Sequence, residues 1–438
     1  MLPGVGWFRG AMRDEQIKRE KRRRRRIRNQ IFAYITIILF GVAALAGLYF
    51  GINGVVRYIK NYNNRVSEVI AEAESGAAAE LESDVQSEQS EPVTVHEEKD
   101  YLPNLSDDPL GELVDTLLQD MTIEEMVAGM FMVTPEALTG VQTVVQAGDG
   151  TKAAIGEKPV GGIVYSAKNF KSKEQFQEML KNTGDFSKYP LFMAVTAECG
   201  ADSPFGIADT KKASEIADAD SAGEAYATIA ETLASYGINM DFAPVSEIVA
   251  SDGDSSLLGR AFGSDAAAAA PLVSASVQAL QDKGVSAVLQ KFPGAGSSQK
   301  TLEELKNSEF IIYESAIKSG VDCIMVSNIS SEGLDADGVP NSLSHTVITD
   351  VLRESLGFEG VVVTDALDEG SITETRTPAE AAVAAVMAGA DVLYRPADFD
   401  EAYAGVLQAV EDGTISKERI RESLVRIYRL KYRDTVLE

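Results

Sequence analysis

From about Leu110 onward, short apolar runs rich in β-branched residues alternate with longer stretches of helical periodicity. This alternation is typical of βα units, whose strands lie side by side in a parallel sheet. Amphipathic stretches such as 172–181, 213–236, 266–282 and 378–387 separate the apolar runs. The runs themselves cover residues 130–133, 162–166, 191–196, 238–244, 287–292, 322–328, 361–365 and 391–394. Eight such units predict a (β/α)8 TIM-like barrel, and a doubly wound open sheet is the alternative because periodicity does not reveal closure.

The first hundred residues have a different character. A basic block at 18–28 is followed by the uncharged apolar stretch 31–52. That stretch exceeds the roughly 20 apolar residues that a membrane-spanning helix needs. The adjacent arginines predict a cytoplasmic N-terminus, with the bulk of the chain on the outer face of the cytoplasmic membrane. A cleavable signal peptide is the alternative, since Ala44-Leu45-Ala46 resembles a cleavage site, but apolar residues continue to Ile52.

These patterns divide the chain into four parts. Residues 1–30 are expected to form a basic cytoplasmic tail and residues 31–52 a single transmembrane anchor. Residues 53–108, rich in Glu, Ser and Ala, are expected to be an acidic, disordered linker. Residues 109–438 are expected to form the barrel.

Charge and composition exclude several classes of function. The net charge of -27 argues against a nucleic-acid partner, and the basic block lies beside the predicted span, where a topological role explains it. The two histidines, His96 and His345, are too few for a zinc site or a Ser-His-Asp triad. The two cysteines, Cys199 and Cys323, are expected to be buried, unpaired thiols.

Active-site residues of a barrel enzyme lie at the C-terminal ends of its strands. Polar residues occur at or just beyond the ends of five predicted strands. They are Glu198, Glu247, Lys291, Asn328 and Asp365. We therefore expect these side chains to gather at one end of the barrel.

Two of these strand ends, those with Lys291 and Asp365, lie in segments that resemble sequences of a known enzyme family. The segments QKFPGAG (290–296) and GVVVTDAL (360–367) resemble the two signature segments of the family 3 glycoside hydrolases, of the β-N-acetylhexosaminidase type. The similarity covers nearly everything after Met121. It implies a (β/α)8 barrel that hydrolyses a β-linked N-acetylglucosamine-type sugar in a glycan, with peptidoglycan-derived glycan as a candidate. It implies no metal or organic cofactor, because the reaction uses carboxylates and water.

The resemblance also implies roles for individual residues. Asp365 stands at the position of the catalytic nucleophile. Arg260, in the segment GRAFGSD, matches a sugar-binding arginine. Lys291, Glu198 and Asn328 stand at substrate-binding positions of the family. The segment Phe292-Pro293 is also a candidate for a cis peptide bond, since only X-Pro bonds adopt cis at low cost.

Several family residues are replaced. Where the family has a Lys-His pair, this chain has Gln290-Lys291. Residues 196–200 replace the family's Asp-x-Glu-Gly-Gly loop, and Asn328 replaces a histidine. The loop that supplies the family's general acid/base is shortened to Ser297-Ser298-Gln299-Lys300. Losing a positioned acid/base typically lowers the rate by about 10² to 10⁴. Candidate substitutes near strand ends are Glu198, Glu247 and Glu369.

Three hypotheses follow. The first is a membrane-anchored retaining hydrolase that acts through Asp365 with impaired activity, with β-glucosidase as an alternative specificity. The second is a catalytically inactive barrel that binds a glycan or an envelope partner. The third is a barrel kept only as a scaffold, with the acidic surface and linker as the functional parts.

Overall fold

The computed structural model describes residues 109–200, 210–249, 257–294 and 297–434. Every described residue lies in one compact unit, Lys99–Glu438. The predicted tail, membrane anchor and linker at 1–108 lie outside the described residues. Among the described residues, no helix is both long enough and apolar enough to cross a membrane.

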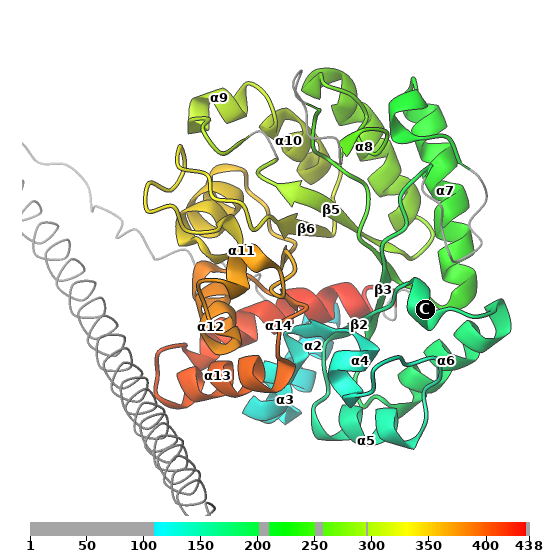
Figure 1. Cartoon of the computed structure of the whole chain (residues 1–438), viewed down its shortest axis with the longest axis vertical. Helices are drawn as coiled ribbons and strands as arrows, with labels where there is room; N and C mark the ends of the chain where they lie inside the picture. Colours follow the sequence, from blue (N-terminus) through cyan, green and yellow to red (C-terminus); the bar gives the residue numbers. More distant parts are fainter. Residues whose placement is uncertain (1–108, 201–209, 250–256, 295–296, 435–438) are drawn as a thin grey trace, which may run out of the picture. The chain divides into compact units, whose positions relative to one another are not determined.

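The described chain forms one parallel sheet of eight strands in the order β7-β6-β5-β4-β3-β2-β1-β8 (Figure 1). A parallel bridge between Val363 and Val392 joins β7 to β8, and the Thr364 N–H donates to the Val392 carbonyl at 3.0 Å. The sheet therefore closes into a (β/α)8 barrel, and the open-sheet alternative is excluded. The strands are β1 (Phe131–Val133), β2 (Gly162–Val164), β3 (Phe192–Val195), β4 (Met240–Asp241), β5 (Ser286–Phe292), β6 (Cys323–Val326), β7 (Val361–Thr364) and β8 (Leu393–Tyr394).

Each predicted apolar run overlaps one of these strands, which confirms the eight βα units. Only β5 begins earlier than expected, by one residue, at Ser286. The strands β4 and β8 are the shortest, with two residues each, and Pro244 follows soon after β4. Proline has no backbone N–H for a sheet hydrogen bond, which limits the strand there.

Helices surround the strands on the outside (Figure 1). They are α2 (Pro109–Asp120), α3 (Ile123–Gly129), α4 (Pro135–Thr139), α5 (Asp149–Glu157), α6 (Lys173–Phe186), α7 (Ala219–Tyr236), α8 (Ala266–Gln281), α9 (Leu302–Lys306), α10 (Phe310–Lys318), α11 (Gly370–Thr373), α12 (Pro378–Ala388), α13 (Phe399–Glu411), α14 (Lys417–Tyr432) and the π-helix η7 (Thr346–Ser355), with single 3₁₀ turns at η2 (Ala167–Asn169), η3 (Ala213–Glu215) and η6 (Asn341–Leu343).

Side-chain caps explain where several helices begin. Ser172 accepts a hydrogen bond from the Gln175 N–H at the start of α6, and Thr377 forms a capping box at the start of α12. The stretch predicted as one helix from residue 213 is instead a 3₁₀ turn followed by α7, because Asp218 caps the helix there. The other predicted helices agree with the structure to within a few residues, except that α6 extends to Phe186.

Close packing at β2 depends on two glycines. A Cβ at Gly161 would lie 2.0 Å from the Gly129 carbonyl oxygen. A Cβ at Gly162 would lie 2.8 Å from the Met132 side chain and 3.0 Å from Phe192. Larger residues here would push β2 away from its neighbours, so these positions help to fix the barrel.

The two cysteines are buried and unpaired, as predicted. Burial raises the pKa of the Cys199 thiol to about 11, so this thiol is protonated at neutral pH. Cys323 lies in β6, inside the apolar core. Both residues are packing groups in this fold.

Candidate active site

Residues from five strands meet at the C-terminal end of the barrel. All strands are parallel, so their C-terminal ends share one end of the ring. Hydrogen bonds and ion pairs connect five residues to which the resemblance gives a role, directly or through a chain neighbour. They are Glu198 after β3, Arg260 after β4, Lys291 in β5, Asn328 after β6 and Asp365 after β7.

Asp365 is held at the end of β7 by both backbone and side-chain contacts. Its N–H donates to the Val326 carbonyl at 2.8 Å, and its Oδ1 accepts from the Ala366 N–H at 2.9 Å. Its Oδ2 lies 2.8 Å from Lys291 Nζ, and the carboxylate side chain is only 6% exposed. The position expected for a nucleophile thus carries a buried carboxylate with one oxygen fixed by the backbone and the other paired with an ammonium group.

Glu198 and Arg260 form a second ion pair. Arg260 Nε and Nη2 donate to the two oxygens of Glu198, each at 2.6 Å. This two-point geometry is the strong form of a carboxylate–guanidinium pair. Gln290 Nε2 lies 3.4 Å from Glu198 Oε1 and also donates to the Phe242 carbonyl. Because Gln290 precedes Lys291, it links this pair to the Lys291–Asp365 pair.

Asn328 closes the other side of the site. Its Nδ2 donates to the Ala366 carbonyl at 2.8 Å and to Glu369 Oε2 at 3.1 Å. Its Oδ1 accepts from the Ser342 hydroxyl at 2.6 Å. The amide is buried and therefore positions the segment after Asp365.

Cis peptide bonds occur at Phe292-Pro293, as predicted, and also at Ala243-Pro244 and Gln290-Lys291. Two of the three flank Lys291 and Phe292 in β5.

Asp241, at the end of β4, is a site residue that the sequence analysis did not single out. It is fully buried, and its Oδ1 accepts from the Ala197 N–H at 2.7 Å, so it supports the loop that carries Glu198. Its Oδ2 has no hydrogen-bond partner among the described residues. Burial, and then the charge of Glu198, raise the pKa of Asp241 well above its ordinary value. The one signal in the sequence was a carboxylate inside an otherwise apolar run.

Arg395, directly after β8, was also missed. It has φ 47°, in the left-handed region that residues other than glycine seldom adopt. Its Nη2 donates to Asp368 at 2.6 Å, three residues beyond Asp365. Strained residues of this kind often occur at functional sites.

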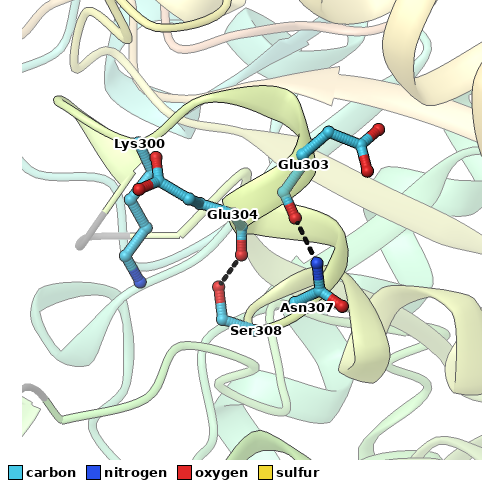
Figure 2. Close-up of a pocket in the computed structure, with 5 residues that line it drawn as sticks. All are labelled: Lys300, Glu303, Glu304, Asn307 and Ser308. Atoms are coloured by element: carbon cyan, nitrogen blue, oxygen red, sulfur yellow. Dashed lines mark hydrogen bonds between the residues drawn. The ribbon is translucent and has the colours of Figure 1, made fainter.

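A hollow of about 420 Å³ lies elsewhere, around α9 (Figure 2). Figure 2 shows Lys300, Glu303, Glu304, Asn307 and Ser308 around it, with Asn307 and Ser308 donating to backbone carbonyls of the helix. None of the five predicted site residues lines this hollow. The chemistry therefore points to the end of β7 as the site.

Removing Arg260 should destabilise the protein, because Glu198 would keep a nearly buried carboxylate without its partner. Arg260→Ala is expected to lower the free energy of unfolding by about 1–3 kcal/mol, with the lower end favoured because Arg260 is partly exposed. Urea unfolding followed by circular dichroism measures this. Lys283→Ala, which breaks an exposed pair with Glu231, is the matched control, and we expect a loss below about 1 kcal/mol. Equal losses for both variants would contradict a structural role of the Arg260–Glu198 pair.

Comparisons with known proteins agree with this geometry. The profile of the Glycosyl hydrolase family 3 N terminal domain matches residues 122–430. A structure of a glycoside hydrolase family 3 β-N-acetylglucosaminidase from Paenibacillus sp. str. FPU-7 is 30% identical, with a TM-score of 0.67, over 73% of this chain and 64% of that chain.

Two curated relatives are similar at the sequence level. An uncharacterized secreted glycosyl hydrolase of Arthroderma benhamiae is 29% identical over 63% of this chain and 86% of its own length. Beta-hexosaminidase A of Pseudoalteromonas piscicida is 27% identical over 63% of this chain and 54% of its own length. The profile match extends across most of the barrel, from α3 to α14. These solved and curated β-N-acetylglucosaminidase and β-hexosaminidase relatives are longer, and the chain spans about two thirds or less of their length. The chain therefore belongs to glycoside hydrolase family 3.

Proposed function

We propose that the protein is a membrane-anchored glycosidase of the β-N-acetylhexosaminidase type that acts on cell-envelope glycans, including peptidoglycan-derived ones, by a retaining mechanism. The observation that carries this proposal is the Asp365 carboxylate, buried at the end of β7 and paired with Lys291. The names of the Paenibacillus and Pseudoalteromonas relatives support the sugar class.

In this mechanism Asp365 attacks the anomeric carbon of the sugar. An Asp365 oxygen forms the bond to carbon while the glycosidic bond breaks, and the leaving oxygen takes a proton from an acid. Water then attacks the glycosyl ester, loses a proton to the same group, and releases Asp365. The Ala366 N–H keeps Oδ1 in place, so Oδ2 is the oxygen that attacks after the substrate displaces or shares Lys291.

Sugar hydroxyls would be bound by the side chains around this carboxylate. Lys291 and Arg260 supply donors, and both are partly exposed. Glu198 and Asn328 fix the orientation of their neighbours through the contacts described above. Natural glycans are expected to react slowly compared with activated sugars, since the family's acid/base loop is shortened.

The membrane anchor in this proposal rests on the apolar stretch 31–52 and its basic flank. It places the barrel on the outer face of the cytoplasmic membrane, where envelope glycans are found. Protease treatment of intact cells should remove the barrel and spare the basic tail.

The stereochemistry of the product tests the mechanism. We expect the full chain in detergent to hydrolyse an aryl β-N-acetylglucosaminide and to release the β anomer first, as observed by proton NMR before mutarotation. An aryl β-glucoside assayed in parallel tests the sugar class. Release of the α anomer would contradict the retaining mechanism, and hydrolysis of neither sugar would contradict the function.

A second function is favoured by one contact. The 2.8 Å pair between Lys291 and Asp365 occupies the carboxylate that must attack. If substrate does not displace Lys291, the barrel would bind a glycan, or an envelope partner, without cleaving it. Saturable binding of a chitin oligosaccharide with no turnover would support this alternative.

A further inference from the structure

Glu369 lies four residues beyond Asp365, on the same loop after β7. It precedes α11 in the position of a helix cap, yet its carboxylate makes no capping hydrogen bond. The side chain instead reaches Asn328, whose Nδ2 donates to Oε2 at 3.1 Å. The residue is exposed, and Oε1 has no hydrogen-bond or ion-pair partner among the described residues. A role in starting the helix therefore does not explain where this carboxylate lies.

Asn328 ties Glu369 to the segment that carries the proposed nucleophile. The same Nδ2 that contacts Glu369 donates to the carbonyl of Ala366, the residue after Asp365. Ser342 fixes the other end of the amide. One buried amide thus sets the position of Glu369 relative to Asp365.

Three other carboxylates near the site, Glu198, Asp368 and Asp241, are committed elsewhere. Glu198 is held at both oxygens by Arg260, and Asp368 is paired with Arg395 at 2.6 Å. Asp241 is fully buried beneath the Glu198 loop and does not reach solvent. Of these four, Glu369 combines an open oxygen with a fixed position beside the Asp365 loop.

We propose that Glu369 is the general acid/base of this enzyme and replaces the group that the family's shortened loop would carry. This inference rests on the proposed function. In the first step the neutral Glu369 carboxyl gives its Oε1 proton to the leaving glycosidic oxygen, while Asp365 bonds to the anomeric carbon. In the second step the Glu369 carboxylate takes a proton from water, the resulting hydroxide attacks the anomeric carbon, and Asp365 leaves. The Asn328 amide donates to Oε2 in both steps.

The test compares two leaving groups in the full chain. A 4-nitrophenyl leaving group needs little protonation, whereas the sugar leaving group of di-N-acetylchitobiose needs a proton. Glu369→Gln is therefore expected to lower kcat/KM about 10²- to 10³-fold for the disaccharide and less than about tenfold for the 4-nitrophenyl sugar. Glu374→Gln, at the other end of α11 and without a hydrogen bond to Asn328, is the matched control and should leave both values unchanged.

The effect of azide on the rate distinguishes an acid/base role of Glu369 from a purely structural role. In Glu369→Ala, azide needs no general base, so it should accelerate turnover of the 4-nitrophenyl sugar and yield the β-glycosyl azide. The wild type should show no such acceleration. Circular dichroism of each variant checks that it folds.

The outcomes separate this inference from the function on which it rests. Glu369 variants that behave like Glu374→Gln, in a wild type that hydrolyses the disaccharide and depends on Asp365, would overturn the role of Glu369 alone. A wild type that hydrolyses neither substrate would overturn both proposals. Equal losses for both leaving groups, without azide rescue, would also overturn the acid/base role.

Discussion

Asp365→Asn should lower kcat/KM for an aryl β-N-acetylglucosaminide by about 10³-fold or more, which corresponds to about 4 kcal/mol in the barrier. The asparagine side chain keeps the size of the carboxylate and can still accept from the Ala366 N–H. It carries no charge and is a poor nucleophile, so the covalent step is lost while the fold is kept. Initial rates of 4-nitrophenol release measure the effect.

Two controls sharpen that experiment. Asp368→Asn removes a nearby carboxylate that is partly exposed and paired with Arg395, and it is expected to change the rate less than about threefold. A 2-fluoro sugar with a good leaving group should add one glycosyl unit to the wild type and none to Asp365→Asn, as seen by mass spectrometry. Unchanged turnover by Asp365→Asn would exclude this residue as the nucleophile.

Asp391→Ala should destabilise the barrel more than any surface substitution. Asp391 precedes β8 and has no exposed surface. It lies 2.5 Å from Arg353 and 3.1 Å from Arg426, and it accepts from the Ser423 hydroxyl at 2.7 Å and the Val362 N–H at 2.9 Å. These contacts join β7, η7 and α14 at the end of the barrel away from Asp365. Removing the shared carboxylate leaves buried arginines unpaired, and we expect a loss of about 3–5 kcal/mol in urea unfolding.

Acid should reduce the difference between the wild type and Asp391→Ala. Burial alone would raise the pKa of Asp391, but the charges of Arg353, Arg426 and Arg419 outweigh burial and hold the pKa below its ordinary value. Because the pKa of Asp391 is lower in the folded protein than in the unfolded chain, the ionised carboxylate stabilises the fold at any pH above the unfolded-state pKa of about 3.9. This stabilisation is lost as the pH falls through the folded-state pKa. The free energies of unfolding of the wild type and Asp391→Ala should therefore show their full difference at pH 7, and this difference should shrink below about pH 4.

Asp400→Ala is the control for both measurements. Asp400 pairs with Lys158 but is 79% exposed, so its removal should cost less than about 1 kcal/mol at any pH. A loss for Asp391→Ala no larger than that of Asp400→Ala would contradict the role of the buried network.

The sequence predicted the eight strands and four helical stretches, three of which begin within one residue of the observed helices. The roles of the candidate site residues stay predictions. Strands and helices have short periods, so a local window contains their signal, and caps such as Ser172 and Thr377 act within four residues. The family resemblance predicted Asp365 as the nucleophile because the matching segment is long and continuous. One helix start was wrong, since the cap at Asp218 takes precedence over the earlier helical pattern.

Closure of the sheet and the partners of each charged group depend on tertiary contacts. The bridge between Val363 and Val392, and the pairs of Lys291 with Asp365 and Glu198 with Arg260, join residues whose proximity no local pattern encodes. Burial is decided in the same way, because it depends on what the rest of the chain packs over a side chain. The sequence shows a carboxylate at Asp241 and at Asp391, but the folded barrel makes the first a shielded acid with a raised pKa and the second the centre of an arginine cluster with a lowered one.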